Sequence, residues 1–207
     1  MPLPIILEKL KKRGKRILAH LGSLPANLSW EVSKPHFAEK TIFFPRYQKA
    51  IEAHQSQLPV LRQSDVQIVD TLKQTGIAIA SLDSLGIPNA DAFFKAAKQI
   101  AKNLEEQAAK IPHEKNYEIH ATKEQLIQHP DIFNWGLNPR LLQMVESYLG
   151  LPVAYDGVSC LLSIANGAEY GARAWHRDRE DRRMIKICVY LNDVDENGGP
   201  FQFLKPQ

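Results

Sequence analysis

Residues 184–204 read MIKICVYLNDVDENGGPFQFL, and this stretch decides which fold class the sequence predicts. Its first part places apolar side chains at every second position, with the period of a half-buried strand: Ile185, Ile187, Val189 and Leu191. Turn-forming residues fill 192–200, and an apolar strand begins again at 201–204. The stretch therefore predicts antiparallel strands late in the chain.

Helical signals dominate the sequence before these strands. Capping residues mark four expected helices: Ser64 with Gly76, Asn89, Thr122 with Gln125, and Asn138 with Gly150. The helix after Asn89 has one apolar face: Phe93, Phe94, Ala97, Ile100, Ala101 and Leu104. Short strands are expected at 77–80 and 153–165. Helices first and strands last predict an α+β fold whose second part is a jelly roll or sandwich.

Basic charge is concentrated in residues 1–21, which hold six Lys and Arg residues against one Glu. The rest of the chain sums to −2 of the total +3, so its body is not expected to bind nucleic acid. Residues 5–21 have the apolar spacing of an amphipathic helix. Such a helix lies on an anionic membrane surface or partner, or it docks its apolar stripe on the domain and shows its charges to water.

A Pro-containing stretch separates this helix from the regular part of the chain. Residues 22–60 hold four Pro residues and scattered aromatic residues, a composition that predicts an irregular connection. We therefore divide the chain into an extension, residues 1–60, and a domain, residues 61–207.

Composition and cysteine use indicate a cytoplasmic protein. Apolar residues make up 44% of the chain, yet no apolar run approaches the roughly 18 residues of a membrane-spanning helix. The N-terminus lacks the features of a secretory signal. Cys160 and Cys188 both lie in apolar runs, which favours buried free thiols over a disulfide or a metal pair.

Candidate metal ligands occur at His176 and Asp178, just before the predicted strands. On an extended backbone, side chains two residues apart lie on the same side, so an imidazole and a carboxylate can occupy adjacent coordination positions. With a second His they would form the two-His, one-carboxylate triad of non-haem Fe(II). A solvated charged loop is the alternative. The other pair with this spacing, His129 and Asp131, lies between helical patterns, and we interpret it as structural.

The segment Trp175-His176-Arg177-Asp178, with the strand, Asn-Gly turn and strand after it, resembles the phytanoyl-CoA dioxygenase family. The resemblance is specific over residues 153–204 and looser over 64–150. It implies a double-stranded β-helix (jelly roll or cupin-like) after the N-terminal helices, with His176 and Asp178 as Fe(II) ligands and 2-oxoglutarate as co-substrate. It also implies a dioxygenase that hydroxylates a lipid-derived or small-metabolite substrate.

The chain departs from that family beyond residue 178. The family places a distal His ligand several tens of residues later, then an Arg that binds the distal carboxylate of 2-oxoglutarate. Here no His follows His176 and no Arg follows Arg183. Lys186 is a candidate contact for a co-substrate carboxylate, with a solvent-exposed Lys as the alternative. We therefore expect a β-helix that is incomplete at its C-terminus, and impaired activity.

Two other classes of function remain open at this point. One is a non-catalytic remnant of an oxygenase. The other is a binding or scaffold protein that works through the basic helix at residues 5–21. An assay for CO2 release from 2-oxoglutarate would distinguish an enzyme, which releases CO2, from both of these classes, which do not.

Overall fold

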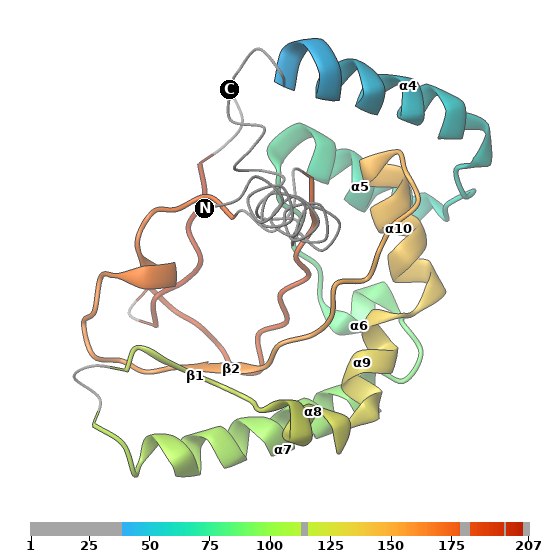
Figure 1. Cartoon of the computed structure of the whole chain (residues 1–207). Helices are drawn as coiled ribbons and strands as arrows, with labels where there is room; N and C mark the ends of the chain where they lie inside the picture. Colours follow the sequence, from blue (N-terminus) through green and yellow to red (C-terminus); the bar gives the residue numbers. More distant parts are fainter. Residues whose placement is uncertain (1–38, 113–115, 179–182, 197, 205–207) are drawn as a thin grey trace, which may run out of the picture. The chain divides into compact units, whose positions relative to one another are not determined.

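The computed structural model describes residues 39–112, 116–178, 183–196 and 198–204 (Figure 1). The predicted basic helix at 5–21 lies outside the described residues. The described chain forms two compact units. The smaller unit holds residues 39–50 together with 176–178 and 183–184, and the larger unit holds the rest.

The smaller unit begins with helical turns where the sequence analysis predicts an irregular connection. A π-helical turn, η1 (Glu39–Phe43), leads into α4 (Phe44–His54), whose last residues belong to the larger unit. That prediction is wrong for these residues, because Pro45 is the second residue of α4 and a proline is tolerated in the first turn of an α-helix. The Arg183 guanidinium lies over the Tyr47 ring, 4.2 Å from its centroid.

The larger unit is mostly helical, and several of its helix ends are those that the sequence predicts. After the turn η2 (Gln55–Gln57) come α5 (Gln63–Thr75), α6 (Leu82–Leu85), α7 (Ala90–Ala108), α8 (Lys123–Ile127), α9 (Pro130–Gly136) and α10 (Pro139–Leu149). The capping box of Thr122 and Gln125 is present. The Asn138 side chain caps α10, and Gly150 ends it in the left-handed conformation. Ser64 is not a cap, because α5 begins one residue earlier, after Arg62.

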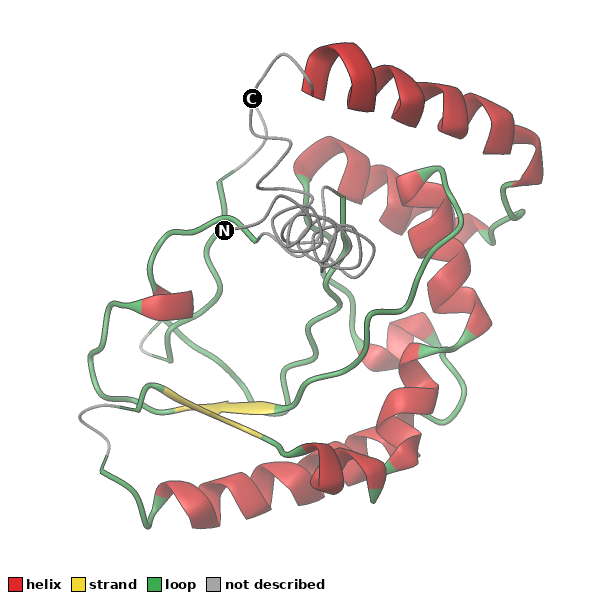
Figure 2. Ribbon diagram, viewed as in Figure 1, coloured by secondary structure: helices red, strands yellow, loops and turns green. Residues whose placement is uncertain are grey.

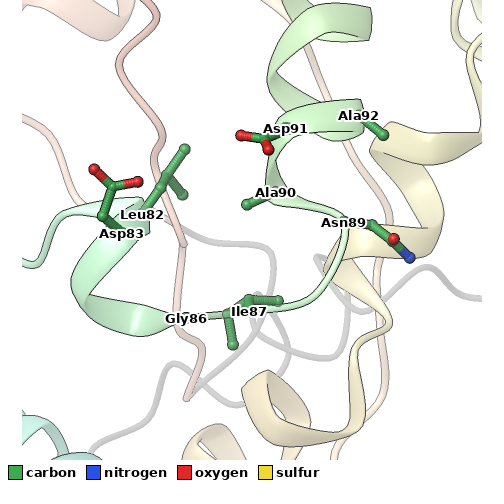
Figure 3. A pocket seen from close by; sticks show the side chains of 8 residues that line it. All are labelled: Leu82, Asp83, Gly86, Ile87, Asn89, Ala90, Asp91 and Ala92. Carbon is green, nitrogen blue, oxygen red and sulfur yellow. The ribbon is translucent and has the colours of Figure 1, made fainter.

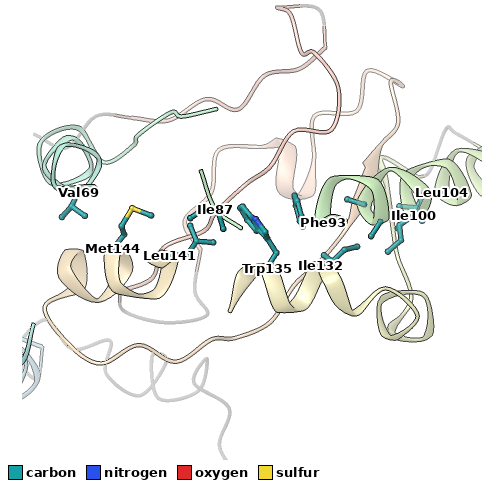
Figure 4. Close-up of a cluster of buried hydrophobic side chains, with 11 residues drawn as sticks. Val69, Ile87, Phe93, Ile100, Leu104, Ile132, Trp135, Leu141 and Met144 are labelled. Atoms are coloured by element: carbon teal, nitrogen blue, oxygen red, sulfur yellow. The ribbon is translucent and has the colours of Figure 1, made fainter. Parts of the chain in front are cut away.

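The apolar core runs through α5, α10, α9 and α7 (Figure 4). The predicted face of α7 is confirmed for four of its members, which are buried: Phe93, Ala97, Ile100 and Leu104. Phe93 stacks on Trp135 of α9, with ring centroids 4.4 Å apart and an interplanar angle of 21°. Residues as buried as Ile100, which has no exposed surface, each contribute about 1.5–3 kcal/mol through burial.

A buried ion pair fastens the start of α10 to the start of α5. The Arg140 guanidinium donates from Nε to Oδ2 of Asp65 at 2.8 Å and from Nη2 to Oδ1 at 2.6 Å. Nη1 donates to the carbonyl oxygen of Leu85 at the end of α6. Asp65 is 1% exposed, so its charge depends on this partner. The pair therefore joins three helices that are distant in sequence.

The predicted jelly roll is absent from the part of the chain that the structure describes, which corrects the α+β assignment. These residues contain seven α-helices and one two-stranded antiparallel sheet, with 4% of them in strands. In the sheet, β1 (Glu118–His120) pairs with β2 (Leu161–Ser163) (Figure 2). His120 lies opposite Leu161. A 3₁₀ turn, η4 (Gly171–Arg173), follows. The resemblance to the dioxygenase family therefore receives no support from the fold.

The other segments predicted as strands have no ladder partner in the described structure. Residues 77–80, 184–191 and 201–204 form no assigned strand. Several of their apolar side chains are exposed: Ile79 93%, Ile187 49%, Phe201 68% and Leu204 81%. Val189 and Leu191 are partly buried and pack against the helical core instead of a second sheet. Alternation along the sequence reports a preference for a half-buried surface, but a strand also needs a neighbour to bond to. The alternation of apolar residues does not specify such a neighbouring strand.

Candidate metal-binding pair and surrounding sites

His176 and Asp178 lie together in the smaller unit, as the spacing predicts. Nε2 of His176 is 3.3 Å from Oδ1 of Asp178, and the two side chains are 46% and 37% exposed. Two ligand atoms at adjacent octahedral positions, each about 2.1 Å from a metal, are about 3 Å apart. The pair therefore fits two neighbouring coordination positions. It equally forms a half-exposed ion pair when the imidazole is protonated.

A third protein ligand does not accompany the pair within the described residues. These residues contain no group of three His, Cys, Asp or Glu side chains placed to hold one metal ion. His176 is also the last His of the printed sequence. The described donor set is therefore one imidazole and one carboxylate.

Lys186, the candidate contact for a co-substrate carboxylate, is exposed on the extended segment 184–191. It belongs to the larger unit, whereas His176 and Asp178 belong to the smaller one. Its proposed role stays a prediction.

The second His-x-Asp pair is structural, as we interpreted it. His129 is the N-cap residue of α9, and Asp131 lies in the first turn of that helix. A carboxylate there interacts favourably with the positive end of the helix dipole.

Sequence reasoning missed a hydrogen-bonded chain of three polar side chains on the ribbon formed by β1 and β2. Nε2 of His120 is 3.0 Å from Oε1 of Glu118, and Nδ1 of His120 is 3.3 Å from Oγ of Ser159. Glu118 and His120 are separated by one residue, the spacing of His176 and Asp178 in reverse order. A search for Glu-x-His as well as His-x-Asp would have found Glu118 and His120. Ser159 is 39 residues away, and only the strand register brings it close.

A shallow pocket of about 530 Å³ lies where α6 meets α7 (Figure 3). Its lining includes the carboxylates of Asp83 and Asp91, the Asn89 amide and several apolar side chains, and it includes no Lys or Arg. Two carboxylates disfavour a dianion such as 2-oxoglutarate. The pocket is therefore a poor match to the expected co-substrate.

Both cysteines are free thiols, as the sequence predicts, but only one is shielded. Burial raises the pKa of the Cys160 thiol, which lies half-buried at the end of the core. Cys188 is exposed, so the prediction that it is buried is wrong. The reason is that Cys188 lies in a segment expected to be a half-buried strand, which forms no assigned strand in the described structure.

The comparisons with known proteins add no family or relative to these observations. Models of protein families, curated proteins and solved structures were all compared with this chain, and none matches. Among the described residues, no helix is both long and apolar enough to cross a membrane. A functional proposal therefore depends on the residues themselves.

Proposed function

We propose that this protein is an Fe(II)-binding member of the 2-oxoglutarate-dependent oxygenases of the phytanoyl-CoA dioxygenase type, with His176 and Asp178 as metal ligands. One observation carries the proposal: the two donor atoms lie 3.3 Å apart and both side chains reach solvent. The sequence around them supplies the resemblance. The proposed substrate class is a lipid-derived or small metabolite.

The chain's own residues set the conditions for binding. Coordination requires a neutral imidazole at His176 and an ionised carboxylate at Asp178, so acid weakens it. Bound Fe(II) would supply activation of O2 coupled to decarboxylation of 2-oxoglutarate. Because the described donors number two rather than three, we expect weak Fe(II) binding. We also expect no 2-oxoglutarate-dependent release of CO2 from the 207-residue chain on its own.

Anaerobic titration of the purified 207-residue protein with Fe(II) tests the metal assignment. His176→Ala should reduce binding, since it removes one of two protein donors. His129→Ala is the matched control, because it changes the His of the structural His-x-Asp pair and should leave Fe(II) binding unchanged. Fe(II) binding that is the same in His176→Ala and in the unmodified protein would refute the proposed ligands.

A second assay measures turnover with Fe(II), ascorbate and 2-oxoglutarate. Robust succinate production that disappears in His176→Ala would show that another part of the chain supplies the third ligand. No production, together with Fe(II) binding that depends on His176, is the expected result.

The alternative function is a non-catalytic remnant or binding protein. The observation that favours it is that the described residues show neither the expected jelly roll nor a three-ligand group. In that case Fe(II) binding would be independent of both His176 and Asp178. The basic residues 5–21, its proposed working surface, lie outside the described residues.

A further inference from the structure

The chain Glu118–His120–Ser159 has the arrangement of an activated nucleophile. It lies entirely in the larger unit and uses none of the proposed iron ligands. The Glu118 carboxylate accepts a hydrogen bond at 3.0 Å when Nε2 of His120 carries the proton. Nδ1 then has a lone pair directed at Oγ of Ser159, 3.3 Å away. A base that is oriented by a carboxylate and faces a hydroxyl is the recurring geometry of acyl-transfer enzymes.

Strand β1 and the segment just before β2 bring these three groups together. Glu118 and His120 are two residues apart on β1, so their side chains lie on the same side. The opposite face is occupied by Ile119 and Leu162, which pack on the core. Since the ribbon is anchored through that apolar face, the polar face has a fixed position and opens to solvent.

The ribbon offers two contacts for an acyl group near Ser159. Leu161 lies directly opposite His120, and its side chain is 51% exposed. The N–H of Ala121 donates to the carbonyl oxygen of Cys160, so the neighbouring pair His120–Leu161 is a non-hydrogen-bonded pair. The Leu161 N–H therefore points away from β1, towards the edge of the ribbon. An apolar side chain and a backbone donor thus lie two residues from Ser159.

We propose that Ser159 is a nucleophile towards carboxylic esters, with His120 as its general base and Glu118 as the residue that positions His120. Oγ of Ser159 attacks the ester carbonyl carbon while its proton moves to Nδ1 of His120. The bond to the alcohol breaks, and the alcohol leaves with that proton. Water then attacks the acyl-serine, again losing a proton to His120, which releases the carboxylic acid and restores the Ser159 hydroxyl.

A fluorophosphonate probe tests this assignment without any metal or co-substrate. The full-length protein is incubated with the probe, and modified residues are located by peptide mass spectrometry. We expect modification of Ser159, with displacement of fluoride from phosphorus. Ser163 is the internal control, because it lies on β2, four residues along the chain from Ser159, and is exposed, but lies opposite Glu118 rather than beside His120. Absence of modification at Ser159 above the level at Ser163 would overturn the proposal.

Variants then separate the roles of the two partners. His120→Ala should slow modification of Ser159 by about 100-fold, the lower part of the range for a positioned base. Glu118→Gln should slow it less, because the amide still bonds to the imidazole but cannot stabilise its positive charge. Ser163→Ala should leave the rate unchanged. A rate at Ser159 that is unaffected by His120→Ala, in protein with an unchanged circular dichroism spectrum, would also overturn it.

Discussion

Removing the charge of Asp65 should destabilise the larger unit more than almost any other single substitution. Asp65 is 1% exposed, and the Arg140 side chain that it neutralises is 14% exposed. Asp65→Asn keeps the size of the side chain and leaves the guanidinium without its counter-charge. Breaking a buried ion pair in this way costs about 3–5 kcal/mol, because the remaining charge is desolvated and unpaired. Domains of this size are stable by only about 5–15 kcal/mol.

Urea unfolding at neutral pH measures the loss. With a denaturant slope of about 2 kcal/mol per molar, a loss of 3–5 kcal/mol lowers the midpoint by about 1.5–2.5 M. Asp70→Asn is the matched control, because Asp70 is an exposed residue of the same helix. It should change stability by no more than about 0.5 kcal/mol. Equal midpoints for Asp65→Asn and Asp70→Asn would refute the proposed role of the ion pair.

The pH dependence gives a second test of the same pair. Hydrogen bonds from the Arg140 guanidinium lower the pKa of the Asp65 carboxyl in the folded protein. The stabilisation is therefore complete above the pKa of an unfolded Asp, about 3.9, and is lost as the pH falls from there through the lower folded value. The difference in stability between the unmodified protein and Asp65→Asn should accordingly shrink in acid. A difference that stays constant down to pH 3 would contradict this assignment.

Three further predictions concern other parts of the chain. Gly136→Ala should cost about 1–3 kcal/mol in urea unfolding, because a methyl group there would clash with the Tyr155 hydroxyl, and Tyr155→Phe should recover part of the loss. Iodoacetamide should alkylate Cys188 well before Cys160, as followed by mass spectrometry, because Cys160 is partly buried and its thiol pKa is raised. Deleting residues 1–21 should leave Fe(II) affinity unchanged while altering solubility or vesicle binding; loss of Fe(II) binding would contradict our division of the chain.

The features that the sequence predicted correctly are those set by neighbours in the chain. The capping box at Thr122, the glycine that ends α10 and the apolar face of α7 each depend on residues within a few turns. The closeness of His176 and Asp178 is local in the same sense, since one residue separates them. The backbone geometry of neighbouring residues allows only a few such arrangements, so the residue pattern alone was sufficient to predict them.

The features that the sequence did not predict depend on partners far along the chain. Asp65 and Arg140 are 75 residues apart, and His54 bonds at 2.7 Å to Glu146, 92 residues away. Strand pairing is the clearest case. Apolar residues do alternate along 184–191, but alternation carries no information about a partner strand. The prediction at Pro45 was wrong for a local reason, because a proline that breaks a helix interior is tolerated in a helix's first turn.

Two carboxylate–imidazole pairs with the same spacing therefore compete as metal sites, and their surroundings distinguish them. Nε2 of His120 is bonded to Glu118, and Nδ1 contacts Ser159, so both ring nitrogens of His120 already have protein partners. At either pair Fe(II) would replace the contact between imidazole and carboxylate, and at the ribbon it would in addition separate His120 from its role towards Ser159. The surrounding sequence that resembles an oxygenase also belongs to His176. We therefore expect His176→Ala, but not His120→Ala, to reduce Fe(II) binding. The reverse result would move the metal site to the ribbon and would remove the nucleophile proposed there.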